Sequence, residues 1–304
     1  MPRIQDWILK CIFYLYPSFE AADKSARGGG TGFFVSVPVE PGQPRTMSLA
    51  YCVTAAHLIE EGNLFLRVNT RDGRFDIIET QASDWTHDPR GSDSAIMMGG
   101  PTPETHEMEH IPSTIFLTRD MLRSYKVGPG DEVYFVGRFV NYDGRGKNTP
   151  SVRFGNISML PEERVKVRGI RAQESYLVEA RSIPGYSGSP VFVYRTPLAP
   201  RPKGFRPLPT TYLLGIDWSH LHDHHKVVRY DEKSRNYVAV TEDLWARQNT
   251  MMMGVIPAYI LNDFLISPEE SGRREKAVAK ERAVEETRAR ATCDAATSEG
   301  PSPG

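Results

Sequence analysis

Short apolar runs rich in β-branched and aromatic residues alternate with turn-forming Gly, Pro and Asp along most of the chain. This pattern is typical of many short strands and argues against βαβ units, in which helical segments separate the strands. It predicts an all-β barrel or sandwich. The predicted strands are 7–16, 33–37, 47–54, 63–69, 74–80, 93–98, 133–140, 151–160, 176–180, 191–194, 211–217 and 251–256.

Two kinds of segment interrupt the strand pattern. Residues 99–110 are polar and proline-rich without periodicity, and we interpret them as the crossing between two halves of similar style. Pro257 opens a predicted helix over 258–265, at a position where a helix tolerates proline. Residues 269–290 are dense in Glu, Lys, Arg and Ala with almost no apolar face. They predict a solvated helix that gives way to a disordered end, and a helix that binds a regulatory protein partner is the alternative.

Composition and charge narrow the function classes. Hydrophobic residues make up 39% of the 304 residues, enough for a core, and the formal net charge of −1 gives no support for a nucleic-acid or membrane-surface partner. Cys11, Cys52 and Cys293 are widely spaced and odd in number, so no disulfide framework or zinc pattern is predicted. Lys10 interrupts the apolar start, and no stretch approaches the roughly 20 apolar residues of a membrane span. We therefore expect a cytoplasmic protein in a reducing compartment.

The candidate chemistry lies in the segment Gly185-Tyr186-Ser187-Gly188, which a predicted strand follows. Glycines allow a positive φ, and they let the N–H groups around a serine point together at a developing oxyanion. A Ser-Gly turn is common, however, and alone this segment predicts only a turn. His57 at the end of a strand and Asp93 at the start of another change this interpretation.

These three residue types suit acyl transfer to a serine. A free hydroxyl is almost never ionised near neutral pH, so Ser187 needs a base, and His57 could take its proton and later return it to the leaving group. A carboxylate behind the imidazole, such as Asp93, fixes the tautomer and stabilises the imidazolium. Asp88 is close enough in sequence to compete with Asp93 for this role.

The local contexts of these residues resemble the trypsin-like (chymotrypsin-fold) serine peptidases, particularly the bacterial trypsin-like peptidase domains. The resemblance covers about residues 8–265 and rests on six motifs in the order of the family. They are GTGFFVS from Gly30, VTAAH ending at His57, DSAIM from Asp93, GYSGSPVF from Gly185, LLGID from Leu213 and MGVIPAYIL from Met253.

The resemblance implies two six-stranded antiparallel β-barrels with a C-terminal helix. We expect the first barrel over 8–110, the second over 111–266, and a charged, helical or disordered tail over 267–304. The strand that continues from Asp93 in the manner of the family favours this residue over Asp88.

The same resemblance implies a serine endopeptidase that hydrolyses a polypeptide substrate through an acyl-enzyme, without a cofactor. Ser187 would be the nucleophile, His57 the general base and Asp93 the orienting carboxylate. The N–H groups of Gly185 and Ser187 would form the oxyanion hole.

Departures from the family pattern bear on regulation. Tyr186 stands where many members carry an aspartate that acts in zymogen activation, and Ser189 replaces a glycine. Nothing in the chain resembles the activation site, so we expect a domain that is constitutively formed or controlled differently. A catalytically silent or latent protease-fold module for binding or scaffolding is the alternative, against which the intact triad argues.

Three residues are candidates for the substrate pocket. Arg181 lies six positions before Ser187, where relatives that cut after basic residues carry an acid, so we expect a basic P1 residue to be disfavoured. The alternative is that Arg181 faces solvent. Asp217 and His220 lie on the strand that resembles the substrate strand of the family. Alternate residues of this strand share a face, so His220 and His222 could meet one ion, but a histidine-rich surface is more common and no metal site is predicted.

Overall fold

The computed structural model describes residues 3–39, 47–166, 172–194 and 211–298, and it is mostly β. The first half of the chain forms an eight-stranded sheet in the order β5-β4-β1-β2-β3-β7-β6, with β8 parallel to β2 and all other pairs antiparallel. Its strands are β1 (Ile12–Tyr16), β2 (Gly30–Pro38), β3 (Ser48–Thr54), β4 (Phe65–Asn69), β5 (Phe75–Glu79), β6 (Thr86–His87), β7 (Ala95–Met98) and β8 (Ile111–Pro112).

The second half forms a closed barrel in the order β10-β13-β18-β15-β14-β9. Two short strands, β11 (Arg164–Val165) and β12 (Gln173–Glu174), pair with each other beside it. The six barrel strands are β9 (Glu132–Gly137), β10 (Ser151–Met159), β13 (Tyr176–Ala180), β14 (Pro190–Val193), β15 (Tyr212–Lys226) and β18 (Trp245–Pro257).

One of the two predicted barrels is therefore shown, and the other is not. The described strands of the first half form a sheet whose end strands, β5 and β6, do not pair with each other. The physical reason is visible in both strands. β6 has only two residues, and β5 is nowhere fully buried, so neither offers a long apolar edge for closure.

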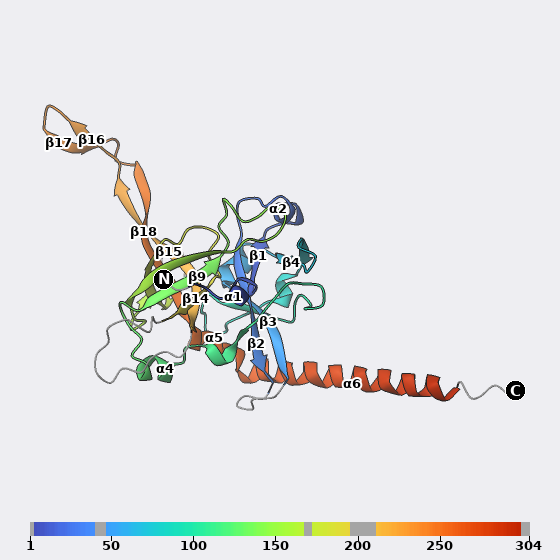
Figure 1. The fold of residues 1–304 in the computed structure, drawn as a ribbon. Helices are drawn as coiled ribbons and strands as arrows, with labels where there is room; N and C mark the ends of the chain where they lie inside the picture. Colours follow the sequence, from blue (N-terminus) through green and yellow to red (C-terminus); the bar gives the residue numbers. More distant parts are fainter. Residues whose placement is uncertain (1–2, 40–46, 167–171, 195–210, 299–304) are drawn as a thin grey trace.

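A two-stranded arm is the largest feature that the sequence pattern did not predict. β15 and β18 continue past the barrel as an antiparallel ribbon, and β16 (Val228–Asp231) and β17 (Asn236–Ala239) form its tip, away from the body of the molecule (Figure 1). The predicted strand ended at Asp217 because the next residues are mostly His and Asp without apolar alternation.

Helices also replace part of one predicted strand. Residues 7–9 belong to α1 (Asp6–Leu9), so the strand predicted over 7–16 begins only at Ile12. Helix α5 (Ala258–Leu265) has the predicted bounds. The remaining short helices are α2 (Phe19–Asp23), α3 (Ala56–Glu60), α4 (Arg119–Ser124), and the 3-10 turns Ala82–Asp84 and Ser113–Ile115.

The tail is the helix α6 (Pro268–Ser298), which extends from the body (Figure 1). Its first turns are not solvated as predicted. Arg274 is fully buried and donates hydrogen bonds to the Leu265 carbonyl and, at 3.2 Å, to the Tyr51 hydroxyl, and Val278 is also buried. Apolar periodicity did not reveal this contact because a buried arginine, rather than an apolar stripe, docks the helix.

Part of the hydrophobic core joins the two halves along a seam, while each half also has a cluster of its own. A single cluster of buried apolar residues contains Tyr14 and Val35 from the first sheet together with Tyr134, Phe192 and Leu213 from the barrel side. The candidate residues lie along this seam, as described below. Among the helices of the described ranges, none combines the length and the apolar character that crossing a bilayer requires.

Candidate functional site

His57 lies in the first turn of α3, directly after β3, and Asp93 holds it at two points. The His57 backbone N–H donates to Asp93 Oδ1 at 2.7 Å, and His57 Nδ1 lies 2.6 Å from Asp93 Oδ2. The Ala56 N–H also donates to the Asp93 carbonyl at 3.2 Å. One aspartate therefore fixes both the backbone and the ring of the histidine.

Asp88 is placed elsewhere. Its carboxylate accepts from Arg90 Nε at 2.9 Å and from Arg90 Nη2 at 3.1 Å, and from the Ser92 hydroxyl at 2.6 Å. With its oxygens committed to these donors, Asp88 does not contact His57. The structure thus separates the two carboxylates that the sequence left in competition.

The environment of His57 acts on its basicity in two directions. Burial lowers the pKa of the imidazole, but the hydrogen bond and the charge of Asp93, with a smaller contribution from Glu61, raise it by more, so the net pKa lies above its ordinary value. A histidine with this pKa is a stronger base once it is deprotonated.

Ser187 belongs to the loop of residues 185–188, here called the serine loop, which lies against the start of β2. The Thr31 N–H, at the start of β2, donates to the Ser187 carbonyl at 2.9 Å, and Thr31 Oγ1 donates to the Gly185 carbonyl at 2.6 Å. Thr54 Oγ1, three residues before His57, donates to the Thr31 carbonyl at 2.7 Å. Thr31 therefore joins the serine loop to the strand end that carries the histidine. Thr31 belongs to the GTGFFVS motif that starts at Gly30, but this motif did not predict the contact with the serine loop.

Glycine is required on both sides of Ser187. Gly188 has a φ of +85°, and a Cβ atom there would lie 2.0 Å from the Thr31 carbonyl oxygen. Gly185 has a φ of +101°, and its Cβ would lie 2.8 Å from the Arg138 carbonyl oxygen. The loop therefore keeps its conformation and its close approach to both halves only with glycine at these positions.

The loop leaves donors free next to Ser187. Within the described ranges, neither the Gly185 N–H nor the Ser187 N–H donates to an acceptor of the chain, whereas the Gly188 N–H is used by the Asp217 carbonyl at 2.7 Å. Two free N–H groups, that of the serine and that of the residue two positions before it, can bind an oxyanion. Over the same ranges, no hydrogen bond joins the Ser187 hydroxyl to the His57 ring.

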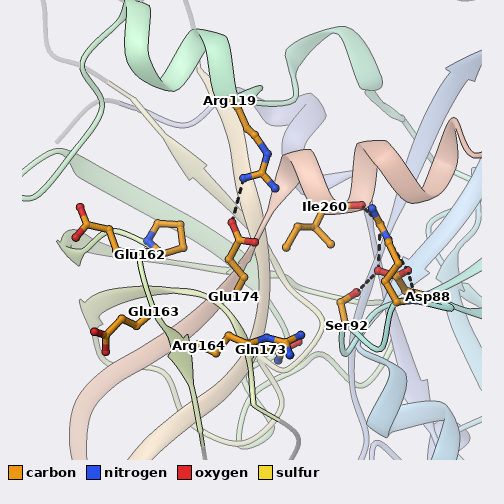
Figure 2. A pocket seen from close by; sticks show the side chains of 11 residues that line it. Asp88, Ser92, Arg119, Glu162, Glu163, Arg164, Gln173, Glu174 and Ile260 are labelled. Atoms are coloured by element: carbon orange, nitrogen blue, oxygen red, sulfur yellow. Dashed lines mark hydrogen bonds and ion pairs between the residues drawn. The ribbon is translucent and has the colours of Figure 1, made fainter.

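Gln173 is a site residue that sequence reasoning missed. Its Oε1 accepts the Asp93 N–H at 2.8 Å, across the seam from β12, and its Nε2 is buried without a hydrogen-bond partner among the described residues. It borders a cavity of about 560 Å³, in which Arg119 pairs with Glu174 at 3.2 Å and Arg164 lies close to Gln173 (Figure 2). An isolated glutamine far from Asp93 in sequence carries no signal of such a contact.

Asp217 lies in the wall behind the serine loop. It is fully buried, Ser182 Oγ donates to its Oδ2 at 2.9 Å, and its Oδ1 has no partner within the described part of the chain. Burial raises the pKa of this carboxyl to about 8, against the lowering effects of the Ser182 hydrogen bond and of His57. Asp217 is therefore largely protonated near neutral pH.

The other two pocket candidates, Arg181 and His220, stay predictions. Arg181 is exposed, as the solvent-facing alternative expects, and it also lines an open cavity of about 490 Å³ with Glu179 and Met251. His220 lies at the base of the arm, where burial, with His222 and Arg247, lowers its pKa to about 4. Its ring centroid lies 4.7 Å from that of His222. A search over the described ranges finds no group of three His, Cys, Asp or Glu residues that could hold a metal ion.

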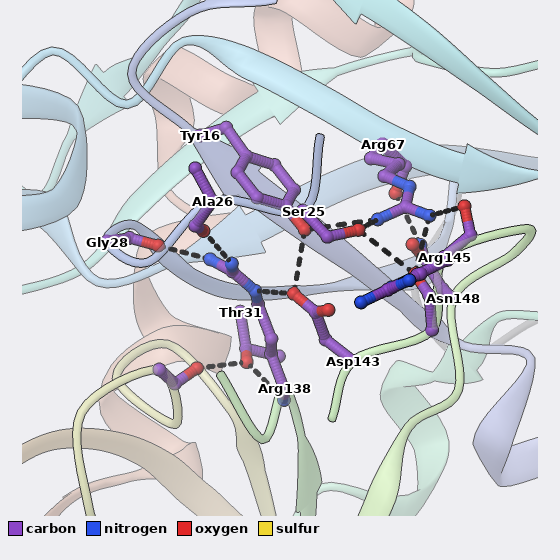
Figure 3. Close-up of polar contacts among 12 residues, drawn as sticks. Tyr16, Ser25, Ala26, Gly28, Thr31, Arg67, Arg138, Asp143, Arg145 and Asn148 are labelled. Atoms are coloured by element: carbon purple, nitrogen blue, oxygen red, sulfur yellow. Dashed lines mark hydrogen bonds and ion pairs between the residues drawn. The ribbon is translucent and has the colours of Figure 1, made fainter. Parts of the chain in front are cut away.

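Buried charges join the halves a short distance from the serine loop (Figure 3). Arg138, at the end of β9, donates through Nε to Asp143 Oδ2 at 2.7 Å, through Nη2 to the Ala26 carbonyl at 2.6 Å, and through Nη1 to the Gly28 carbonyl. Its backbone N–H donates to Thr31 Oγ1 at 2.9 Å. The residue thus holds the segment that leads into β2 against the barrel.

Arg67 forms a second contact of this kind from β4. Its Nη1 donates to the Ser25 hydroxyl at 2.6 Å and its Nη2 to the Gly144 carbonyl at 2.7 Å (Figure 3). Asn148 donates to the Arg67 carbonyl at 2.6 Å. The stretch 140–150 is therefore bonded to the first half at several points.

Comparisons with known proteins find similarity only at the level of structure, because no family model and no curated protein matches the chain. The MamO protease domain from Magnetospirillum magneticum is 14% identical, with coverage of 86% of this chain and 98% of that one and a TM-score of 0.48. The inactive form of the Rv3671c protease from M. tuberculosis is 15% identical, with coverages of 85% and 88% and a TM-score of 0.43.

The HtrA-type protease AlgW, solved with a decapeptide, is also 15% identical, with a TM-score of 0.41, and the match covers 85% of this chain but 65% of AlgW. These structures are trypsin-like protease domains, the class that the sequence motifs resemble. At such identities and TM-scores the similarity says nothing about activity, so the chemistry of this chain has to rest on its own residues.

Proposed function

We propose that the chain is a serine endopeptidase of the trypsin-like class, in which the first sheet takes the place of the first of two barrels. The observation that carries the proposal is the two-point attachment of His57 to Asp93, at 2.7 and 2.6 Å. The bonds of Thr31 connect the serine loop to the strand end that carries His57, and the N–H groups of Gly185 and Ser187 are free within the described ranges, which supports Ser187 as the nucleophile of this base.

The proposed reaction has two halves. His57 removes the Ser187 proton as the oxygen attacks the substrate carbonyl, and the N–H groups of Gly185 and Ser187 bind the oxyanion of the tetrahedral intermediate. His57 then gives the proton to the leaving amine, which releases the first product and leaves an ester on Ser187. Water activated by His57 hydrolyses the ester by the same steps. Asp93 keeps Nδ1 protonated, so that Nε2 is the atom that accepts and returns the proton.

The substrate proposed is a polypeptide, without a defined P1 residue. We keep the expectation that a basic P1 residue is disfavoured, because Arg181 lines an open cavity of about 490 Å³ on the barrel. Asp217, in the wall behind the loop next to Ser182, and His220 are the further pocket candidates.

One observation favours the second candidate function, a latent or silent protease-fold module. No hydrogen bond joins Ser187 to the His57 ring in the described part of the chain. Catalytic hydrogen bonds are often long or poorly aligned before substrate binds, so this geometry is compatible with an active enzyme as well. Reactivity of the serine separates the two functions.

Labelling of the purified protein with a fluorophosphonate probe tests the proposal. We expect wild type to be labelled, Ser187→Ala and His57→Ala to lose labelling, and Ser189→Ala to keep it. Ser189 is a matched control because it lies two residues away and its buried hydroxyl has no partner within the described ranges. Folded wild-type protein without labelling would reject the endopeptidase and leave the silent or latent module.

A further inference from the structure

The side chain that precedes the candidate nucleophile is anchored inside the barrel. Tyr186 is fully buried, and its hydroxyl is bound by two residues of β10, the Ser151 hydroxyl and Arg153 Nε, the latter at 2.9 Å. Its ring packs edge-on against Phe135, with centroids 5.2 Å apart, and the Arg153 guanidinium lies 5.0 Å from the ring centroid. Polar and aromatic contacts thus hold the side chain from several sides.

Arg153 also binds the backbone that leads to Ser187, at Arg181. Its Nη1 donates to the Arg181 carbonyl at 2.8 Å, while its Nε holds Tyr186. One β10 side chain therefore fixes both ends of the stretch 181–186 that leads to Ser187. Near the start of this stretch, Asn249 Nδ2 donates to the Ser182 carbonyl at 2.7 Å.

This anchor sets the position of the free N–H groups. The Tyr186 carbonyl accepts the Ser189 N–H at 2.8 Å, and the Tyr186 N–H donates to the Ile183 carbonyl at 3.2 Å. The peptide group between Tyr186 and Ser187 contains the Ser187 N–H of the candidate oxyanion hole. The peptide group between Gly185 and Tyr186 lies one residue after the other donor, the Gly185 N–H. A rotation of the Tyr186 side chain out of its site would turn these peptide groups with it.

We propose that Tyr186, with Arg153 and Ser151, is an internal brace that keeps the oxyanion hole formed, so that Tyr186 is a positioning residue for the reaction. The inference rests on the function proposed above. The partners of the Tyr186 side chain lie on β10 and in the barrel core, so the donors are aligned before substrate binds. Fixed donors that need no reorganisation during the reaction are worth most to catalysis.

Tyr186→Phe tests the brace because it removes only the hydroxyl. Tyr176→Phe is the matched control, since Tyr176 is also a fully buried tyrosine of the barrel but its hydroxyl has no partner within the described ranges. Three quantities are compared: the second-order rate constant for fluorophosphonate labelling, the acylation rate with p-nitrophenyl acetate across pH, and Tm.

We expect Tyr186→Phe to slow labelling and acylation by about 10- to 100-fold, since misaligned oxyanion donors cost part of the 10²–10³ that loss of one donor costs. The midpoint of its pH profile should stay at the wild-type value, because the His57–Asp93 pair is untouched. Tyr176→Phe should react at the wild-type rate. Arg153→Lys, which keeps the charge but loses the two-pronged grip, should fall between wild type and Tyr186→Phe.

Two outcomes would overturn the brace while wild type remains reactive. One is Tyr186→Phe labelling and acylating at the wild-type rate. The other is an equal loss of rate in Tyr186→Phe and Tyr176→Phe that follows their loss of Tm, which would assign Tyr186 a general packing role. Wild type that does not label at all would instead reject the proposed function, and the brace with it.

Discussion

Gln173 accepts the backbone N–H of Asp93 at 2.8 Å, and this bond crosses from β12 to the loop that orients His57. Substitution by leucine keeps the volume but leaves a partly buried N–H without an acceptor, which costs about 1–3 kcal/mol. We expect Gln173→Leu to lower the free energy of unfolding by less than this amount, because it also removes the buried Nε2 that has no partner within the described ranges, and to slow fluorophosphonate labelling. Urea denaturation and labelling kinetics measure the two effects.

The control for Gln173→Leu is Glu162→Gln, an exposed residue on the rim of the same cavity. It should change neither quantity. A Gln173→Leu protein with wild-type stability and rate would show that the bond to Asp93 contributes nothing to either.

The raised pKa of His57 gives the pH dependence of the proposed reaction. Only the neutral imidazole accepts the Ser187 proton, so the labelling rate should rise with pH through a midpoint above the ordinary value of about 6.5. Asp93→Asn should lower this midpoint and reduce the rate by about 10³- to 10⁴-fold, because the amide neither stabilises the imidazolium nor fixes the tautomer. A midpoint at or below 6.5 in wild type would contradict the environment described for His57.

Asp217 should make the fold less stable as pH rises. Its carboxyl has a pKa of about 8 in the folded protein, above the value of about 3.9 in the unfolded chain, so the native state holds a proton that the unfolded state has lost between these values. The stabilisation by this group is complete below about pH 4 and is lost as pH rises toward 8.

Asp217→Asn removes this dependence and retains an oxygen for the Ser182 hydroxyl. The stability difference between variant and wild type should therefore grow in favour of the variant from pH 5 to pH 8, with a slope of at most about 1.4 kcal/mol per pH unit. Urea denaturation at both pH values gives the slope. A constant difference would mean that Asp217 does not take up a proton on folding.

Arg138 and Asp143 form a buried ion pair at 2.7 Å, with side-chain exposures of 0% and 6%. Arg138→Met leaves the carboxylate buried without its charge partner and should cost about 3–5 kcal/mol in the free energy of unfolding. The double variant Arg138→Met, Asp143→Leu should be more stable than Arg138→Met alone, because it removes the stranded charge. Equal stabilities of the single and double variants would show that Asp143 finds other donors.

The parts of the site that local sequence encodes were predictable. His57 and Asp93 follow or precede short apolar strands, and the glycines around Ser187 report a turn with positive φ, which the structure has at Gly185 and Gly188. In each case the signal lies within a few residues of the functional group. The bond between His57 and Asp93 then follows from pairing of β3 with β7.

The parts that depend on tertiary contacts were not predictable. Gln173 contacts Asp93, and Arg153 contacts Tyr186, although both pairs are far apart in sequence. Local patterns in a single sequence carry no signal of such contacts. The arm beyond Asp217 has the composition of a loop, and its strand structure comes from pairing with β18, not from its own periodicity.

Thr31 has a consequence for how this chain can change in evolution. The same residue accepts the Arg138 N–H, holds the Gly185 carbonyl and donates to the Ser187 carbonyl. Folding of the two halves and alignment of the nucleophile therefore draw on one set of bonds. A substitution that weakens the bonds of Thr31 should therefore lower the thermal stability of the fold and disturb the alignment of Ser187 at the same time.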